Sequence, residues 1–380
     1  MNNETRLVQL TANSHDPKAF AEAVSEAHFK IRDFVTDTRD VNMFTDKDGS
    51  MISLRGIGAN DAEGEFAPES FTVNPWAHNQ LADFCGIPQA YYRRMQDEQH
   101  GLLDTSVRTW LDAAGGKRRM VRTVDGKVRA FLSDRYRRID NYHVANTVLP
   151  VLAEAGATFR RLHVTEDSMV IQAVFTEKKA DVTLGDTIML GVTIENNEVG
   201  RGNVSIMPMS LRLVCMNGMT HNEFGHKRQH VGTRLGGDGD PSEFYADDTL
   251  QASDQALMLQ LRDVTRKACS DALLESLVAD MQRAQGVAIT TQPVHAVAEL
   301  ANRTGLNEAE GAGVLSHLLA GGTMTQYAMV QAITRHAQDV ADGTRGHELE
   351  VIGGNILALA AAEFAPIATA GAPKPTRRRR

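Results

Sequence analysis

The sequence has few cysteines and no long hydrophobic run. Its 380 residues include three cysteines, Cys85, Cys215 and Cys269. Because they are odd in number and far apart, they argue against a disulfide framework and favour a reducing compartment. The N-terminus, MNNETRLVQL, lacks the basic start and apolar core of a secretory signal. No apolar run reaches the roughly 18 residues that a membrane helix needs. We therefore expect a soluble cytoplasmic protein with no membrane partner.

Common catalytic signatures are also missing. The chain contains no GxxxxGKS/T, HExxH, GxSxG or CxxC pattern, and no cofactor is predicted. Four carboxylates could still gather near a basic strand and hold magnesium for phosphodiester cleavage. They are Asp134, Asp140, Glu195 and Glu198. Their spacing does not require this arrangement, so a metal-dependent nuclease is an alternative and an enzyme is not the leading hypothesis.

One segment, CMNGMTHNEFGHKRQH, is rich in potential zinc ligands. These are Cys215, His221, His226 and His230. Zinc sites usually contain a CxxC pair, or two histidines spaced on a helix. This segment has a single cysteine in an expected strand, so the sequence predicts no metal site there.

Charge is distributed unevenly along the chain. The formal net charge is −8, yet the window from Lys117 to Arg138 holds nine basic residues against Asp125 and Asp134. That window carries about +7, and the last residues of the chain add five further positive charges. A protein that separates charge in this way has a local positive field although its total is negative.

Hydrophobic periodicity and turn residues predict the order of the elements. A helix is expected after the cap Asp16 and Pro17. Two helical pieces around Gly86 and Pro88 have the layout of a helix-turn-helix, or of plain helix packing. The elements expected after them are a hairpin turning at Asp125-Gly126, a helix from Asn141 to Gly156, a hairpin turning at 166–168, two strands joined by the loop 196–203, and a long helix from about 249.

These elements predict an α+β fold. The order β-β-α-β-β-β-β indicates one antiparallel sheet with a helix packed on one face, flanked by N-terminal and C-terminal helical regions. The predicted regions are a mixed, mostly helical region over 1–116, the sheet and helix core over 117–235, a helical region over 249–364, and a disordered basic tail over 371–380.

The segment VRAFLSDRYRRIDN, residues 128–141, is the densest part of the basic window. Alternation along a strand divides 127–132 into an apolar face and a face with two cations and one aromatic ring. The apolar face would hold Val128, Ala130 and Leu132, and the other Lys127, Arg129 and Phe131. Such a face suits a nucleic-acid strand, because guanidinium groups bind phosphates and bases stack on the ring. The alternatives are internal ion pairs, solvated arginines or a small anionic ligand.

We therefore predict a nucleic-acid-binding surface around this strand. In it the cations contact phosphates, Phe131 and Tyr136 stack on bases, and the loop ENNEVGRGN offers backbone N–H groups and Arg201 to an anion. The predicted residues are Lys117, Arg118, Arg119, Arg122, Lys127, Arg129, Phe131, Arg135, Tyr136, Arg137, Arg138 and Arg201.

Four segments resemble a known family. VRAFLSDRYRRIDN, NEVGRGNVSIMPMSLRLVCMNGM, QYAMVQAITRHAQD and ELEVIGG are similar to the phage/plasmid-like proteins grouped as domain of unknown function 932, over about residues 50–360. The resemblance implies a prophage, plasmid or integrative element, where proteins often anneal DNA strands, protect ends or block host defence. The expected core is also similar in outline to that of single-strand annealing proteins, which carry a basic groove on an oligomeric ring. A homo-oligomer would follow from that comparison.

The leading functional hypothesis is therefore sequence-tolerant binding of nucleic acid, in particular single-stranded DNA, in the recombination or replication of a mobile element. A helix-turn-helix regulator is a variant of this hypothesis. The alternatives are a protein-binding anti-defence factor, whose acidic bulk faces a DNA-binding partner, and a metal-dependent nuclease.

Overall fold

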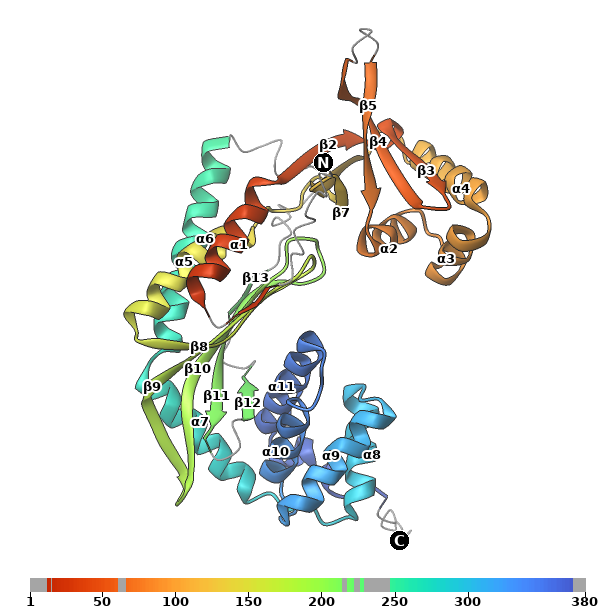
Figure 1. Cartoon of the computed structure of the whole chain (residues 1–380). Coiled ribbons are helices and arrows are strands. Elements are labelled where there is room, and N and C mark those ends of the chain that lie inside the picture. Colours follow the sequence, from red (N-terminus) through yellow and green to blue (C-terminus); the bar gives the residue numbers. More distant parts are fainter. Residues whose placement is uncertain are drawn as a thin grey trace, which may run out of the picture.

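The computed structural model describes residues 12–14, 16–60, 66–213, 217–221, 226–228 and 247–371. Within these ranges the chain has an α+β fold with twelve α-helices and two β-sheets. Figure 1 shows the sheets following one another along an arc, with the last helices at the lower end. The predicted fold class is confirmed.

The first sheet has six strands in the order β2-β6-β7-β5-β4-β3. Its strands are β2 (Ile31–Asp37), β3 (Val41–Asp46), β4 (Gly49–Asn60), β5 (Phe66–Val73), β6 (Arg118–Val124) and β7 (Lys127–Ser133). All neighbours are antiparallel except β5 and β7. The helices that pack against it are α2 (Pro75–Phe84), α3 (Gln89–Glu98) and α4 (His100–Ala113). Their shared core includes Leu81, Leu103, Ile52 and Phe131.

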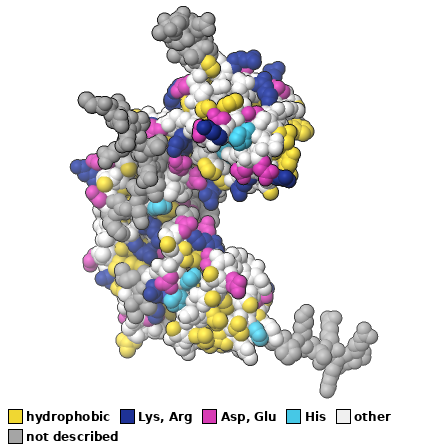
Figure 2. Space-filling model, turned by 45° about the vertical axis from the view of Figure 1, so that its right-hand side comes forward, with side chains coloured by type: hydrophobic (Ala, Val, Ile, Leu, Met, Phe, Trp, Pro, Cys, Tyr) yellow, Lys and Arg dark blue, Asp and Glu magenta, His cyan; other side chains and the backbone are white. Residues whose placement is uncertain are grey.

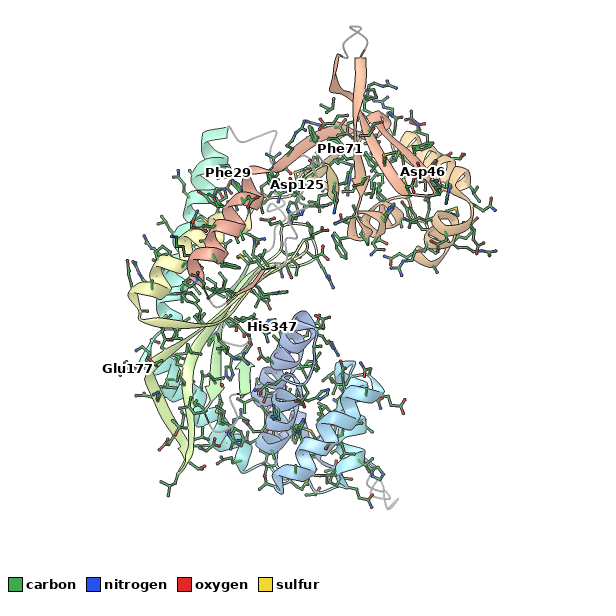
Figure 3. The ribbon with its side chains drawn as sticks, viewed as in Figure 1. Phe29, Asp46, Phe71, Asp125, Glu177 and His347 are labelled. Carbon is green, nitrogen blue, oxygen red and sulfur yellow. The ribbon has the colours of Figure 1, made fainter. Side chains whose placement is uncertain are left out.

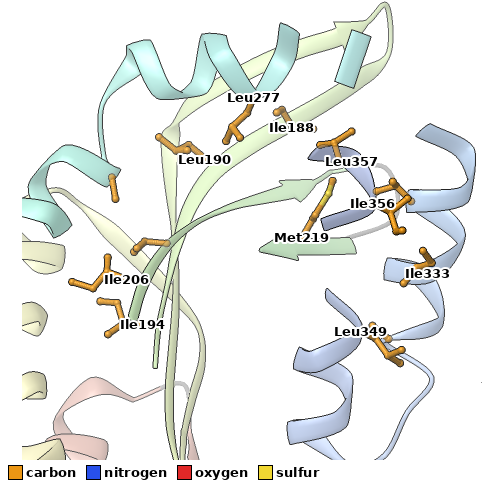
Figure 4. Close-up of a cluster of buried hydrophobic side chains, with 14 of the residues drawn as sticks. Ile188, Leu190, Ile194, Ile206, Met219, Leu277, Ile333, Leu349, Ile356 and Leu357 are labelled. Carbon is orange, nitrogen blue, oxygen red and sulfur yellow. The ribbon is translucent and has the colours of Figure 1, made fainter. Parts of the chain in front are cut away.

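The second sheet has seven antiparallel strands in the order β1-β8-β9-β10-β11-β12, with β13 also paired to β11. Its strands are β1 (Ala12–Ser14), β8 (Ala157–Val164), β9 (Met169–Thr183), β10 (Asp186–Asn196), β11 (Val204–Arg212), β12 (Asn217–Thr220) and β13 (His226–Arg228). The helices that contribute to its main core include α1 (Pro17–Phe29), α5 (Asn141–Glu154), α6 (Asp247–Ala268) and α7 (Asp271–Gln285). In Figure 4, Leu277 of α7 lies over Ile188 and Leu190 of β10.

The local turn signals are confirmed in detail. Asp125 and Gly126 have φ angles of 45° and 75°, the two left-handed residues that a tight type I′ hairpin needs. Helix α1 begins at Pro17, and the Asp16 side chain accepts the Lys18 N–H. The β8–β9 hairpin and the β10–β11 connection also lie where the turn residues predict them.

Three expectations about longer stretches are wrong. The hairpin β6–β7 does not share a sheet with β8–β12, because its edge pairs residue by residue with β2. The first helix, which the sequence favours over residues 15–34, ends at Phe29, and Ile31 already begins β2. The long helix from about 249 is broken, since Ser270 has extended backbone angles at the start of α7. The helix expected from Asn141 is confirmed as α5, with Asp140 at its N-cap.

The C-terminal helices pack against the far end of the second sheet. They are α8 (Pro293–Thr304), α9 (Glu308–Gly321), α10 (Gln326–His336), α11 (Gly343–Ala358) and α12 (Ala361–Ala368). Figure 4 shows Met219 of β12 close to Leu357 and Ile356 of α11, and all three side chains belong to the main core. Among the described residues no single helix is long and apolar enough to cross a membrane. Helices α11 and α12 reach that length and hydropathy only when taken together, and they are bent by 114° relative to each other.

A glycine allows α11 to approach β12 closely. A Cβ on Gly354 would overlap the backbone carbonyl of Thr220, whereas a Cβ on Gly311 of α9 would meet nothing within 4 Å. We expect Gly354→Ala to lower the free energy of unfolding by roughly 1–3 kcal/mol, because the helix must move off the strand. Gly311→Ala should be neutral or raise it by up to about 1 kcal/mol, because alanine favours a helix. Urea unfolding of both variants checks this, and equal effects would contradict the close approach.

Candidate functional site

Two arginines of the predicted DNA-binding surface lie inside the protein, where the two sheets meet. Arg122 of β6 is fully buried. Its Nε and Nη2 donate to the two carboxylate oxygens of Asp33 at 2.8 and 2.9 Å. Its Nη1 lies 2.8 Å from Asp140 Oδ1 and donates to the Glu198 carbonyl oxygen at 3.2 Å. One guanidinium group therefore joins β2, the start of α5 and the loop after β10.

Arg129 of β7 completes this junction. It is 2 % exposed, and its Nη1 donates to Glu198 Oε2 at 3.0 Å. Its Nη2 donates to the Glu166 carbonyl oxygen in the β8–β9 turn at 2.6 Å. The other carboxylate oxygen of Glu198 accepts the first N–H of α5, from Asn141, at 2.6 Å. Together Arg122, Arg129, Asp33, Asp140 and Glu198 form what we call the inter-sheet ion cluster.

The charges in this cluster set the protonation of their neighbours. Burial opposes the ionisation of Asp140, but His28 and Arg122 hold the pKa of its carboxyl well below the usual range. A hydrogen bond to Asp140 in turn raises the pKa of His28. Each acidic side chain of the cluster lies next to at least one arginine, as buried charges require.

The two aromatic residues expected to stack on bases are buried as well. Phe131 is 1 % and Tyr136 9 % exposed, and the Tyr136 hydroxyl donates to the Asn197 carbonyl oxygen at 3.0 Å. The expected alternation is broken because Arg122 pairs with Ala130 while Thr123 pairs with Val128, which leaves Arg129 as the extra residue of a bulge. The prediction of an open cationic and aromatic face is therefore wrong for Arg122, Arg129, Phe131 and Tyr136.

The remaining predicted cations lie around the rim of the junction. Lys117 and Arg118 are exposed, and neither has an ion-pair partner in the described part of the chain. Arg135 is half-buried and its backbone N–H donates to Ser133 Oγ. The others pair with carboxylates: Lys127 with Glu166 at 3.9 Å, Arg137 with Asp254 at 2.6 Å, Arg138 with Asp33 at 3.2 Å, and Arg201 with Asp167 at 3.1 Å.

A cavity of about 640 Å³ opens beside the junction, between α2, the strands β6 and β7, and the loop after β10. Arg119 forms one wall, with its guanidinium carbon 4.8 Å from the ring centre of Phe84 and 5.0 Å from that of Phe131. Its Nη2 donates to the Phe131 carbonyl oxygen, while its Nε has no hydrogen-bond partner among the described residues. Burial lowers the pKa of Arg119. Arg201 and Asp83 also line the cavity.

This cavity has the features of a ligand site for a planar anion. Its volume lies within the range of roughly 300–1,000 Å³ that small-molecule pockets occupy. It combines two guanidinium groups with the half-buried ring of Phe84. Of the predicted residues, the structure brings Arg119, Phe131, Tyr136 and Arg201 together here.

Sequence reasoning missed the contribution of α2. Trp76 Nε1 and Gln80 Nε2 both donate to the Val199 carbonyl oxygen at 2.8 Å, and Gln80 Oε1 accepts the Phe131 N–H. The helix start was visible in Asn74-Pro75, and the i,i+4 spacing places Trp76 and Gln80 on one face. The groups that this face meets, however, lie 51 to 123 residues further along the chain.

The loop ENNEVGRGN does not offer its backbone to an anion as predicted. The Asn197 side-chain oxygen accepts the N–H groups of Val199 and Arg201 at 3.1 and 2.7 Å. Gly200 has a φ of 78°, and a Cβ there would come within 2.5 Å of a methyl group of Leu132. The loop is therefore closed on itself and packed against β7.

A second buried polar network ties α11 to the open face of the second sheet. His347 contacts Glu195 through Nε2, and its Nδ1 lies 3.6 Å from Glu350. Arg160 and Gln172 each hydrogen-bond to Glu350, at 2.8 and 2.6 Å. Figure 3 shows His347 at the upper end of α11, facing the sheet. Burial opposes a charge on His347, but the two carboxylates raise its pKa to about 9.

The predicted carboxylate group does not form. Asp140 and Glu198 belong to the inter-sheet ion cluster, Glu195 contacts His347, and Asp134 accepts a bond from Ser133. Of the residues weighed as zinc ligands, His221 is buried and lies 2.9 Å from Ser210 Oγ. Cys215, His230, the side chain of His226 and the basic tail after 371 lie outside the described residues.

No model of a protein family, no curated protein and no solved structure matches this chain. The resemblance to the phage/plasmid-like proteins therefore stays a prediction.

The inter-sheet ion cluster predicts a large effect of removing Arg122. We expect Arg122→Ala to lower the free energy of unfolding by roughly 3–5 kcal/mol, because Asp33 and Asp140 lose the fully buried cation that they share. The matched control is Arg138→Ala, which removes a half-exposed partner of the same Asp33 and should change stability by at most about 1 kcal/mol. Urea unfolding at neutral pH measures both. Similar losses in the two variants would show that the buried pairing does not hold the sheets together.

The His347 network predicts a pH dependence of stability. Because the pKa of His347 rises from 6.5 to about 9 on folding, its contribution is fully present below pH 6.5 and is lost as pH rises toward 9. The slope from this group is at most about 1.4 kcal/mol per pH unit. Urea unfolding of the wild type and His347→Gln at pH 6.5, 8 and 9 tests this. The difference in stability should shrink with rising pH, and a constant difference would contradict the raised pKa.

Proposed function

We propose that this protein binds single-stranded nucleic acid, in particular DNA, through the cavity beside β6 and β7. The observation that carries the proposal is Arg119, whose guanidinium group lies against the contacting rings of Phe84 and Phe131 at the cavity wall. The positive charge of this guanidinium group attracts a phosphate, and a base can stack on the neighbouring ring of Phe84. Phe84 takes the place of the buried Phe131 and Tyr136 in this role.

The exposed cations suit the path of a short strand rather than a long one. Lys117 and Arg118 directly precede Arg119 on the chain, and Arg201 lines the same cavity. Lys117 and Arg118 do not line the cavity themselves, so they would contact only phosphates of a strand that extends outside it. On the face of the molecule in Figure 2, basic and acidic side chains are interspersed, so contacts to many phosphates are not expected.

The number of contacts sets the expected salt dependence. Each phosphate contact on a single strand contributes a slope of about −0.7 to log K against log salt concentration. With four cations, Lys117, Arg118, Arg119 and Arg201, the slope is about −3. The proposed biological role is recombination or replication of a phage, prophage or plasmid in the cytoplasm. The protein would be able to form a homo-oligomer.

Titration of labelled oligonucleotides tests the proposal. We expect the wild type to bind single strands more tightly than duplexes at low salt, and Arg119→Ala to weaken binding roughly tenfold, about 1.4 kcal/mol. Phe84→Ala should weaken it by roughly 1–3 kcal/mol through lost stacking. The control is Arg303→Ala, which removes the same charge from a remote exposed pair on α8 and should bind as the wild type does. Thermal melting confirms that each variant is folded.

The outcomes separate the alternatives. Failure of the wild type to bind any oligonucleotide at low salt would reject the proposal and favour a protein-binding anti-defence factor. Degradation of DNA only when magnesium or manganese is added would favour the nuclease. Preference for one duplex sequence over all single strands would favour a helix-turn-helix regulator, with α2 and α3 as its helices.

A further inference from the structure

Two histidines and one aspartate converge where α9 passes the end of α10. His317 Nε2 lies 2.7 Å from Asp339 Oδ2, and His336 Nδ1 lies 3.9 Å from the same oxygen. All three ligand atoms lie within 4.8 Å of one another. None of these residues belongs to the cavity proposed to bind nucleic acid.

The packing of the two helices brings the rings together. His336 is the last residue of α10, and Asp339 follows it by three residues, so both project from the same end of the helix. The His336 ring packs against Gly313 of α9, where a Cβ would overlap the imidazole. His317 lies one turn further along α9, on the same face as Gly313. The glycine therefore admits the His336 ring to the position where it meets His317.

The spacing of the donor atoms suits a transition metal. Bonds of 2.0–2.1 Å in tetrahedral geometry place neighbouring ligand atoms about 3.4 Å apart. The two measured distances to Asp339 Oδ2, 2.7 and 3.9 Å, lie on either side of this value, so small side-chain rotations would bring the three atoms onto one ion. Two imidazoles and one carboxylate are ligands that zinc and similar ions prefer.

The surroundings also suit a metal site. Asp339 directs Oδ2 toward the two rings, while its Oδ1 lies 3.7 Å from Arg335. A partner on the second carboxylate oxygen orients a ligand without occupying the coordinating atom. The side chains of His317 and Asp339 are 26 % and 43 % exposed, so an ion can enter and keep water at a remaining position.

A second cluster, His28, Asp140 and His143, has a similar composition. There, however, the guanidinium group of Arg122 lies 2.8 Å from Asp140. A buried cation at that distance opposes the binding of a divalent ion. The second cluster serves instead as a comparison for the first.

We propose that His317, His336 and Asp339 bind one divalent transition-metal ion of the zinc type, which links α9 to the end of α10. The inference is independent of nucleic-acid binding.

The test uses the untagged full-length chain, freed of metal by a chelator, and cobalt(II) as a visible probe that zinc displaces. The wild type should bind one equivalent of cobalt with absorption bands of a low-coordinate site, and zinc should raise its melting temperature. His317→Ala and Asp339→Asn should each weaken cobalt binding at least tenfold and abolish the rise. His143→Ala is the control for the second cluster and should behave as the wild type does.

Several results would overturn the proposal. These are the absence of cobalt or zinc binding by the wild type at micromolar concentrations, binding that is unchanged in both His317→Ala and Asp339→Asn, or binding that is lost in His143→Ala. Binding that disappears in Cys215→Ser would also overturn it, by assigning the ion to another segment. Because Asp339 is partly exposed and asparagine has nearly the same shape, Asp339→Asn keeps the test decisive even if His317→Ala does not fold. Thermal melting without metal checks that each variant is folded.

Discussion

The arrangement of the molecule depends on the pairing of Arg122 with Asp33 and Asp140. These residues come from β6, from β2 and from the N-cap of α5, and they meet where Arg122 is fully buried and both carboxylates are largely buried. Each charge alone would be very unfavourable there, so the charges are stable only together. The pairing therefore defines how the hairpin β6–β7 of the first sheet is placed against the helix and loops of the second.

This constraint explains the dense basic stretch in an acidic protein. Arg122 and Arg129 neutralise carboxylates of the protein itself, and Tyr136 and Phe131 fill the space between α2 and the loop after β10. The cations that stay available are those beyond the ends of the buried segment, such as Lys117 and Arg118. Within this stretch, the basic side chains that do not pair with the protein's own carboxylates are therefore fewer than the sequence suggests.

The second sheet carries buried charge at its other boundary too. His347 and Glu350 of α11 meet Glu195, Arg160 and Gln172 on the face that the other helices leave open. The inter-sheet ion cluster and the His347 network are alike in this respect. An apolar core stabilises each layer, and a set of paired charges specifies how neighbouring layers pack. Hydrophobic contacts are non-directional, whereas hydrogen-bonded ion pairs have a preferred geometry, so this division of roles gives the arc a defined shape.

The sequence by itself determined the local elements and the fold class. Asp125-Gly126 specified a hairpin, Asp16-Pro17 a helix start, and the alternating stretches after Ala157 an antiparallel sheet, because turn residues and periodicity act over a few positions. Only the tertiary structure decided that β6 pairs with β2, that Arg122 faces Asp33, and that Trp76 and Gln80 bind the loop at Val199. The sequence of a charged strand is the same whether its side chains face water or carboxylates of the same protein. The partners of Arg122 are 18 to 89 residues away along the chain. The packing of whole sheets, and not the residues next to Arg122 in the sequence, therefore brings them into contact.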